Sequence, residues 1–208
     1  MQTPDFDALF NADPDPWGYR TRWYEQRKRN LTLAALPRAR YGRVFEPGCG
    51  NGELSAALAL RCERLLAADA SERAVALARQ RLQGFAHVEV ALLRVPEGWA
   101  DRDGPFDLIV ISELAYYLHD DAQARLCALC VATLSDGGTV VACHWRRPIP
   151  DAQRSGDAAH AALHAGLGLS AVGGWVDEDF RIDVWSRQPL SVGEQEGLVR
   201  GGARRPSG

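Results

Sequence analysis

The chain has 208 residues, of which 46% are apolar, so it can bury one substantial core and favours one domain over two. Its formal net charge of −3 offers no positive field to a polyanion, so we expect no nucleic-acid partner. The N-terminus MQTPDFDALF lacks the basic start and apolar run of a secretory signal, and no stretch reaches the roughly 18 apolar residues of a membrane span. These features predict a soluble, cytoplasmic protein without a membrane partner.

The first expected element is a helix that begins at Asp15-Pro16, a cap followed by a first-turn proline, and runs to Leu36 before Pro37. It belongs to an N-terminal helical extension over about residues 5–37.

Strand and helix patterns then alternate through the middle of the chain. Strands are expected at 43–46, 64–69, 88–93, 106–112 and 139–145, and helices at 53–62, 71–82 and 120–134. The strand at 106–112 is almost continuously apolar, which is typical of a strand covered on both faces. This alternation predicts an α/β fold with a parallel sheet wrapped on both sides and ligands at the carboxyl ends of its strands.

The pattern weakens after Pro150. The remaining expected elements are a helix at 156–167 and strands at 169–176 and 180–186. From about Gln188 the chain is rich in glycine and poor in apolar residues, which predicts a mobile tail over 188–208.

We therefore expect a single domain over 1–187. Its parts are the helical extension, a ligand-binding core over about 41–145 and a C-terminal segment over about 146–187.

The five cysteines form an odd set in apolar or helical context, typical of buried free thiols. Cys127 and Cys130 make a C-x-x-C inside ARLCALCVATL, a helical pattern without glycine or proline. We interpret the pair as helix packing rather than as a redox or metal site.

The glycine-rich stretch VFEPGCGNGEL at 44–54 joins the first strand of the core to a helix, so it is built to bring a ligand close to bare backbone. A dinucleotide site needs a third glycine in G-x-G-x-x-G, and Glu53 occupies that position. A carboxylate there would repel a pyrophosphate at the helix N-terminus, which argues against a nicotinamide cofactor.

The motif that is present, E-x-G-x-G-x-G, resembles the first motif of class I S-adenosylmethionine-dependent methyltransferases. Its members are Glu46, Gly48, Gly50 and Gly52. The resemblance implies that Glu46 meets the cofactor's ammonium, directly or through water, and that Gly48 and Gly50 let the backbone approach it.

Asp69 closes the second strand of the core, where a carboxylate can accept both ribose hydroxyls. The alternative is that Asp69 caps the following helix, but Ser71 already fits that role. Further candidates for cofactor contact flank these positions: Cys49, Ala70 and Ser112.

Many class I enzymes carry an acid after the third strand that contacts the adenine amino group, but this chain has Arg94 there. We therefore assign adenine recognition to backbone and apolar contacts around Leu93, Arg94 and Val95.

The fourth strand ends in ISELAYYLHD, without the N/D/S-P-P-aromatic tetrapeptide of base-directed amino methyltransferases. Glu113, Tyr116 and Tyr117 are expected to face the cleft, where a carboxylate and aromatic faces suit a cationic acceptor or the sulfonium itself. For one of the two tyrosines, ordinary packing is the alternative.

Together, E-x-G-C-x-x-G, the acid at 69 and E-x-x-Y-Y-L resemble the nodulation protein S (NodS) family of N-methyltransferases, which act on an amino sugar. The stretches DPW (15–17) and WYEQRKR (23–29) fit the same family, and the resemblance covers about residues 13–145.

The resemblance implies a Rossmann-like fold with a seven-stranded, mostly parallel sheet flanked by helices. It also implies S-adenosyl-L-methionine as cofactor, S-adenosyl-L-homocysteine as its product, and a small-molecule amine as acceptor. The long chito-oligosaccharide of nodulation is not carried over, because segment 146–187, where such enzymes build much of the acceptor site, does not match. We expect a monomer or a homodimer.

In this family the N-terminal helix closes over the cofactor. Arg27 or Arg20 could then meet the methionyl carboxylate, and Trp17 or Trp23 the sulfonium side; a surface arginine with a snorkelling stem is the alternative.

An amine near its pKa supplies a lone pair with little help, whereas a hydroxyl needs a base. Glu113 and His144 are the candidate catalytic residues. Two other functions stay open: O-methylation, and a non-catalytic module that binds S-adenosylmethionine.

His160 and His164 have the i, i+4 spacing of metal ligands but no third ligand nearby in the sequence, so we expect no metal. His160 and Trp145 are instead candidates for the acceptor pocket.

Overall fold

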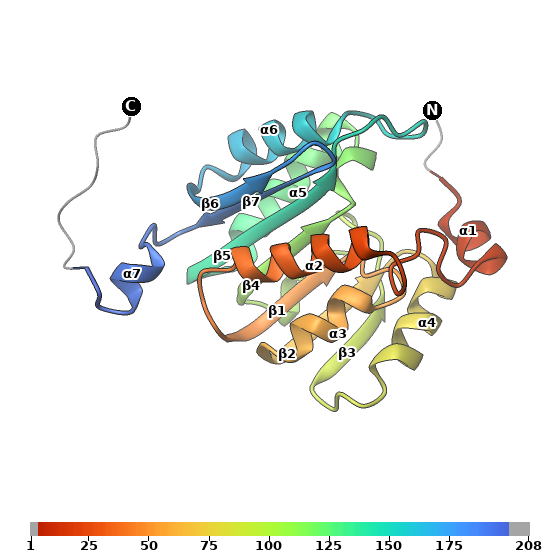
Figure 1. Cartoon of the computed structure of the whole chain (residues 1–208), viewed down its shortest axis with the longest axis horizontal. Helices are drawn as coiled ribbons and strands as arrows, with labels where there is room; N and C mark the ends of the chain where they lie inside the picture. Colours follow the sequence, from red (N-terminus) through yellow and green to blue (C-terminus); the bar gives the residue numbers. More distant parts are fainter. Residues whose placement is uncertain (1–3, 200–208) are drawn as a thin grey trace.

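The structure is a computed structural model that describes residues 4–199. Its centre is a seven-stranded sheet with the strand order β3-β2-β1-β4-β5-β7-β6 (Figure 1). The strands are β1 (Tyr41–Pro47), β2 (Cys62–Asp69), β3 (Val88–Leu92), β4 (Phe106–Ser112), β5 (Leu134–Trp145), β6 (Ser170–Val176) and β7 (Phe180–Ser186). Strands β1 to β5 pair in parallel and β7 is antiparallel to both of its neighbours, so the predicted mostly parallel sheet is confirmed.

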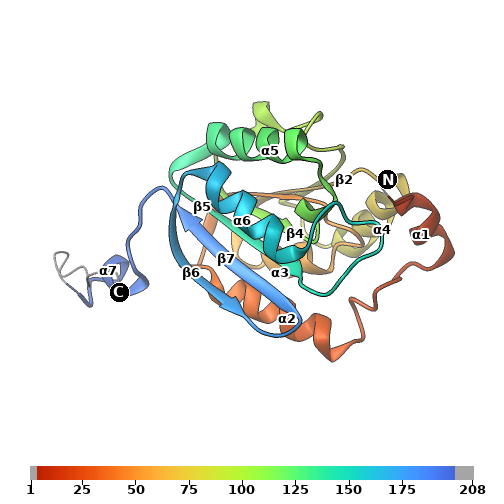
Figure 2. The same cartoon turned by 90° about the horizontal axis from the view of Figure 1, so that it is seen from above.

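Helices cover both faces of the sheet (Figures 1 and 2). They are α1 (Phe6–Ala12), α2 (Trp23–Ala35), α3 (Glu53–Ala59), α4 (Glu72–Leu82), α5 (Asp120–Thr133), α6 (Gly156–Leu167) and α7 (Val192–Gln195), with short 3-10 turns η1 (Asp101–Asp103) and η2 (Ala115–Tyr117). Adjacent residues in a strand point to opposite faces. Val44 accordingly packs with α2, α3 and α4, while Phe45 packs with α5 and α6.

The strand order reverses between β1 and β4, because β1 continues to β2 on one side while β4 continues to β5 on the other. In an open parallel sheet this reversal leaves a crevice at the carboxyl ends of the strands. The glycine loop after β1, Asp69 at the end of β2 and Ser112 at the end of β4 all lie at this edge.

The N-terminal extension differs from the predicted single helix. Helix α2 begins at Trp23, and the carboxylate of Asp15 accepts hydrogen bonds from the backbone N–H groups of Tyr19 (2.8 Å) and Arg20 (3.1 Å). Asp15 therefore stabilises a turn rather than a helix start. The sequence pattern of a cap residue before proline does not distinguish these two roles. A separate helix, α1, begins after its N-cap Asp5.

Part of the predicted tail is helical. Ser191 and Glu194 form a capping box, in which the Ser191 side chain accepts from the Glu194 backbone and the Glu194 side chain from the Ser191 backbone, and this starts α7. The high glycine content led us to predict a mobile tail despite this S-x-x-E signal. The structure instead forms a helix over residues 192–195. Residues 200–208 lie outside the described residues.

Gly52 gives the first testable prediction. Its φ of +82° is left-handed, and a Cβ there would lie 3.1 Å from the Cα of Ala78 in α4. We expect Gly52→Ala to lower the free energy of unfolding by about 1–3 kcal/mol, through backbone strain and the α3–α4 contact. Urea denaturation measures this difference.

Gly84→Ala is the matched control, because a Cβ at Gly84 would meet nothing within 4 Å. Its effect should stay within about 0.5 kcal/mol. Equal stabilities for the two variants would contradict a packing role for Gly52.

Candidate functional site

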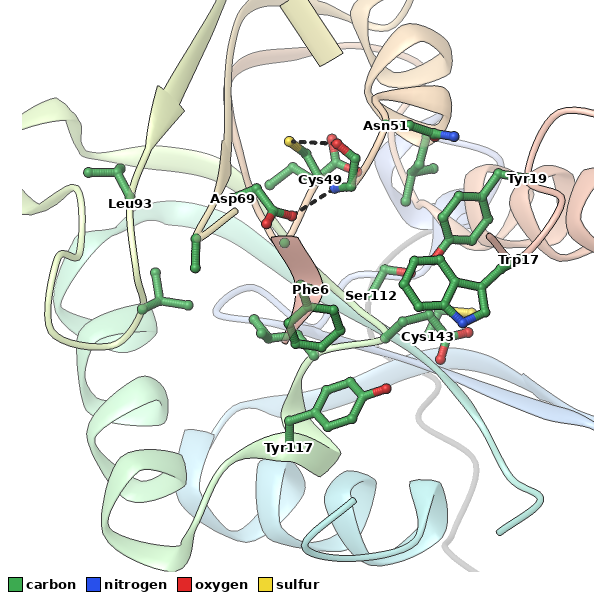
Figure 3. Close-up of a pocket in the computed structure, with 18 of the residues that line it drawn as sticks. Phe6, Trp17, Tyr19, Cys49, Asn51, Asp69, Leu93, Ser112, Tyr117 and Cys143 are labelled. Atoms are coloured by element: carbon green, nitrogen blue, oxygen red, sulfur yellow. Dashed lines mark hydrogen bonds between the residues drawn. The ribbon is translucent and has the colours of Figure 1, made fainter. Parts of the chain in front are cut away.

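A cavity of about 380 Å³ lies at the crevice, within the size range of small-molecule sites. Its floor comes from the loops after β1, β2, β3 and β4, and its other walls come mainly from the N-terminal segment and α2, with Ala122 of α5 and Cys143 of β5. In Figure 3, Asp69 and Leu93 lie toward one end, Trp17 and Tyr19 toward the other, and Phe6 and Ser112 between them.

The glycine loop and Asp69 are joined directly. One Asp69 oxygen accepts from the N–H of Gly50 at 2.9 Å, and the other from the N–H of Ser71 at 3.0 Å. Burial raises the pKa of Asp69, while these backbone hydrogen bonds act against that rise. Asp69 therefore holds the loop in place, and its oxygens keep lone pairs for a ligand.

The backbone at Gly50 is left-handed, with φ of +55°, and a Cβ there would lie 3.6 Å from the rings of Phe10 and Tyr19. The absent side chain leaves the cavity open between the loop and the aromatic rings. Gly48 and Cys49 line the same wall.

Glu46 is a buried carboxylate, 2% exposed, that lines the cavity. Its Oε2 has no hydrogen-bond partner among the described residues, and burial raises the pKa of Glu46 to about 8. A buried acceptor without a donor is costly. A ligand with an ammonium group beside the glycine loop would supply the missing donor.

The far end of the floor is less polar. Leu93, Arg94 and Val95 line it after β3, and Ala70 lines it after β2. The Leu93 N–H donates to the Asp69 carbonyl at 2.9 Å, which places this segment beside the carboxylate.

Aromatic rings from the N-terminal segment cover the cavity. Phe6 meets Tyr117 edge-on at 5.3 Å between ring centroids, and Trp17 lies 5.5 Å from Tyr19 (Figure 3). Phe10 meets Trp17 edge-on at 5.4 Å. These rings add apolar surface to the cavity wall on the side of the N-terminal segment.

The cover is anchored to the floor at two points. The Asp7 carboxylate in α1 accepts from the Ser71 hydroxyl at 2.5 Å and from the Arg73 N–H at 3.1 Å, at the start of α4. Asn51 in the glycine loop donates to Asp15 at 3.0 Å. The N-terminal segment is therefore part of the site.

A buried ion cluster forms the wall nearest α2. Lys28 Nζ lies 2.6 Å from Glu113 Oε1 and 3.0 Å from Glu25 Oε2, and all three residues line the cavity. Burial opposes the charge of Lys28, but the two carboxylates hold its pKa well above the ordinary value.

The second oxygen of Glu113 is also occupied, because it accepts from the Tyr116 hydroxyl at 2.5 Å and from the Trp145 N–H at 3.1 Å. Glu113 lies in the cavity wall, as the sequence indicates, but its hydrogen bonds leave it poorly suited to act as a base.

The comparisons agree with this architecture. Residues 44–138 match a family model described as a methyltransferase domain. The crystal structure of a candidate methyltransferase from Pseudomonas syringae has 49% sequence identity and a TM-score of 0.71, and the match covers 79% of this chain and 99% of that chain. This chain belongs to the class I methyltransferases.

The NodS resemblance is also confirmed. Nodulation protein S of Sinorhizobium fredii is 33% identical over 115 residues, which cover 55% of this chain and 52% of that protein. The structure of N-methyltransferase NodS from Bradyrhizobium japonicum in complex with S-adenosyl-L-homocysteine has 23% identity and a TM-score of 0.73, and the match covers 87% of this chain and 97% of that chain. The chain spans about half the length of the curated relatives it matches. The methyl donor of this family is S-adenosylmethionine.

His144 of the methyltransferase is fully buried and does not line the cavity, so its predicted position as a cleft base is wrong. Its Nε2 accepts from the Ala115 N–H at 3.0 Å, its Nδ1 lies 3.1 Å from His160 Nε2, and His160 Nδ1 lies 2.7 Å from Asp183 Oδ2. Because His144 Nε2 accepts, its Nδ1 must donate to His160, which in turn donates to Asp183.

This chain of hydrogen bonds fixes the η2 turn after β4. Burial also holds the pKa of His144 well below its ordinary value, so the ring stays neutral. The prediction of His160 in the acceptor pocket is wrong for the same reason, since its ring is committed to His144 and Asp183.

Four other predicted contacts lie away from the cavity of the methyltransferase. Trp23 is 70% exposed, and Trp145 packs edge-on against Tyr24. Tyr116 is buried, and its hydroxyl donates to Glu113. Gly52 lies beneath α4 rather than in the wall.

The predicted arginines also point elsewhere. Arg27 pairs with Asp177 at 2.6 Å and lies over the ring of Phe180, while Arg20 pairs with Glu53 at 3.1 Å. Arg29, two residues after Arg27, is the arginine of α2 that lines the cavity. The sequence therefore indicated the wrong arginine of α2.

The sequence analysis missed Glu25, Lys28, Arg29, Tyr19 and the phenylalanines of α1. The stretch WYEQRKR carries three of them, but nothing local shows which side of the helix faces the sheet. The segment 146–187, expected to build the acceptor site, contributes no residue to the cavity wall. It forms α6, β6 and β7 instead.

The five cysteines of the methyltransferase are buried and unpaired. Among residues 4–199 there is no group of three or more His, Cys, Asp or Glu side chains that could hold a metal ion. The helices described in that range are also too short or too polar to cross a membrane.

The raised pKa of Glu46 predicts a pH-dependent stability. In the folded protein its pKa is about 8, above the ordinary value of 4.5, so between these limits the folded state keeps a proton that the unfolded chain loses. The contribution of Glu46 to stability therefore falls as the pH rises from 4.5 to 8.

Glu46→Gln removes this titration. We compare the free energy of unfolding of the variant with that of the wild type. The difference should shift in favour of the variant by up to about 3 kcal/mol as the pH rises from 5.5 to 7.5, because one pKa unit corresponds to about 1.4 kcal/mol. Urea denaturation at both pH values checks this, with the exposed Glu63→Gln as control. A difference that does not change with pH would contradict a buried, protonated Glu46.

Proposed function

We propose that this chain transfers a methyl group from S-adenosylmethionine to the nitrogen of a small-molecule amine. The observation that carries the proposal is the pairing, in one covered cavity, of the unpartnered Glu46 oxygen with the Asp69 carboxylate. The first suits an ammonium and the second a ribose, and S-adenosylmethionine carries both.

The residues at the cavity wall suit each part of the methyl donor. Glu46 would accept from its ammonium and Asp69 from its ribose hydroxyls, while Leu93 and Val95 would contact the adenine. Arg29 is the cation we assign to the methionyl carboxylate, in place of Arg27 or Arg20. When bound, the sulfonium supplies an electrophilic methyl group that a lone pair displaces in line.

The protein's own residues supply shielding and alignment. The aromatic rings of the N-terminal segment would displace water around the bound methyl donor, and the ion cluster around Lys28 joins α2 to the wall after β4. An amine needs only to lose a proton before it attacks, whereas a hydroxyl requires a base. His144 does not line the cavity and both oxygens of Glu113 accept hydrogen bonds, so neither residue predicted as a base is free for a hydroxyl. The acidic cavity wall favours an acceptor that arrives as a cation, as an amine does and a hydroxyl does not.

The proposal includes a cytoplasmic location, which the five unpaired cysteines support. A small-molecule acceptor as the partner, and a monomer or homodimer as the assembly, stay predictions.

Asp69 provides the test of cofactor binding. By calorimetry, Asp69→Ala should weaken binding of S-adenosylhomocysteine by about 10-fold to 100-fold, because it removes charged acceptors from the ribose and from the Gly50 loop. The control is Glu63→Ala, which removes an exposed acid on the same strand. Its affinity should stay within 2-fold of the wild type, which corresponds to a change of about 0.4 kcal/mol or less in binding free energy.

Turnover is tested by release of S-adenosylhomocysteine with a panel of amines and their hydroxyl counterparts. Turnover confined to hydroxyl compounds would favour O-methylation. Cofactor binding without turnover on any compound would favour a binding module, and binding of a pyridine dinucleotide instead would overturn the proposal.

A further inference from the structure

One carboxylate in the cavity wall has oxygens that the protein does not use fully. Glu25 on α2 is 7% exposed and lines the cavity. Its oxygens lie 3.2 Å and 3.0 Å from Lys28 Nζ, and Lys28 is the hydrogen-bond partner found for it among residues 4–199. A carboxylate can accept about four hydrogen bonds, so Glu25 keeps unused lone pairs.

Its neighbour Glu113 differs in this respect. Both oxygens of Glu113 are held, one by Lys28 and the other by Tyr116 and the Trp145 backbone. At this end of the cavity, Glu25 therefore has more unused acceptor capacity for a ligand than Glu113.

The charges around Lys28 do not balance. Two carboxylates share one ammonium, which leaves one negative charge in a buried place. Arg29 also faces Glu25, but its guanidinium donates to the Tyr19 carbonyl at 3.2 Å, and we assign it to the methyl donor. The other titratable groups nearby are Tyr19, Tyr24 and Cys143, whose pKa values burial raises, so they stay neutral.

A buried charge without a counterion is costly, and the wall therefore suits a cation. Aromatic faces favour the same ligand, because Trp17, Tyr19 and Tyr117 line the same cavity as Glu25 and Lys28.

We propose that Glu25 binds the ammonium group of the methyl acceptor and takes its proton before transfer. The inference rests on the proposed function, and it narrows the acceptor to a primary or secondary amine with an apolar body. Aromatic rings of α1 and of the turn after it line the cavity and suit such a body.

The acceptor ammonium loses a proton to the Glu25 carboxylate, and the freed lone pair forms the new N–C bond with the methyl carbon. The C–S bond breaks and its electron pair remains on sulfur, so the sulfonium becomes a neutral thioether while the nitrogen becomes a methylated ammonium. Burial raises the pKa of Glu25, against the opposing effect of Lys28, and so makes it a stronger proton acceptor.

The test uses the full chain saturated with S-adenosylhomocysteine, and its probes are two pairs of equal shape. Benzylamine is compared with benzyl alcohol, and cyclohexylamine with cyclohexanol, by calorimetry at pH 7.5. We expect each amine to bind at least 10-fold more tightly than its alcohol.

Glu25→Gln keeps the shape of the side chain and removes its charge, and Lys28 keeps Glu113 as partner. This variant should lose at least 10-fold in amine affinity while alcohol and S-adenosylhomocysteine affinities stay within 3-fold. Glu178→Gln, an exposed acid in the β6–β7 turn, should match the wild type.

Two results overturn the inference: amines that bind no better than their alcohols, and a Glu25→Gln variant that keeps the amine preference. In both cases S-adenosylhomocysteine still binds, and the proposed function survives. If S-adenosylhomocysteine fails to bind the wild type, the proposed function fails and this inference fails with it.

Discussion

The ion pair between Lys28 and Glu113 is the contact on which the cavity wall depends, since it joins α2 to the loop after β4. Its atoms lie 2.6 Å apart, from residues 85 positions apart in the chain, and both side chains are largely buried. Breaking a buried pair by removing one partner typically costs about 3–5 kcal/mol, because the other charge is left uncompensated. The position of α2, and with it Glu25, Arg29 and the turn before the helix, follows from this contact.

The same constraint explains why the sheet was easier to predict than the site. The strands follow from apolar runs, and the glycine loop and Asp69 follow from strand ends, which are local patterns. Lys28 and Glu25 could not be assigned, because a helix with charges on several sides does not reveal which side meets the sheet. His144 shows the opposite error: its strand-end position is correct, but its role depends on His160 and Asp183, which lie 16 and 39 residues further along the chain.

Residues at the N-terminus illustrate a second limit of the sequence. Asp15 and Pro16 have the composition of a helix start, yet the Asp15 carboxylate stabilises a turn and meets Asn51 in the glycine loop. A side chain that can cap either a helix or a turn is decided by its tertiary partner, and here that partner is part of the binding loop.

Glu46 and Glu25 together explain the acidic lining of the site. Among the described residues at the cavity wall, six are acidic and three are Lys or Arg. A buried carboxylate without a donor destabilises the protein, so selection for stability alone would remove it. The proposed reaction gives a reason to keep such groups, because it brings two cations together: a sulfonium compound with an ammonium of its own, and an amine that arrives protonated.

Two like charges in a water-poor cavity repel strongly unless the wall carries negative charge. An ammonium bound beside the glycine loop would favour the charged form of Glu46, and Glu25 lies on α2, so each cation has a separate carboxylate. Lys28 keeps Glu25 and Glu113 from repelling each other before either ligand arrives. On this view the destabilising acids, the buried lysine and the aromatic cover are one solution to one electrostatic problem, which a neutral hydroxyl acceptor would not pose.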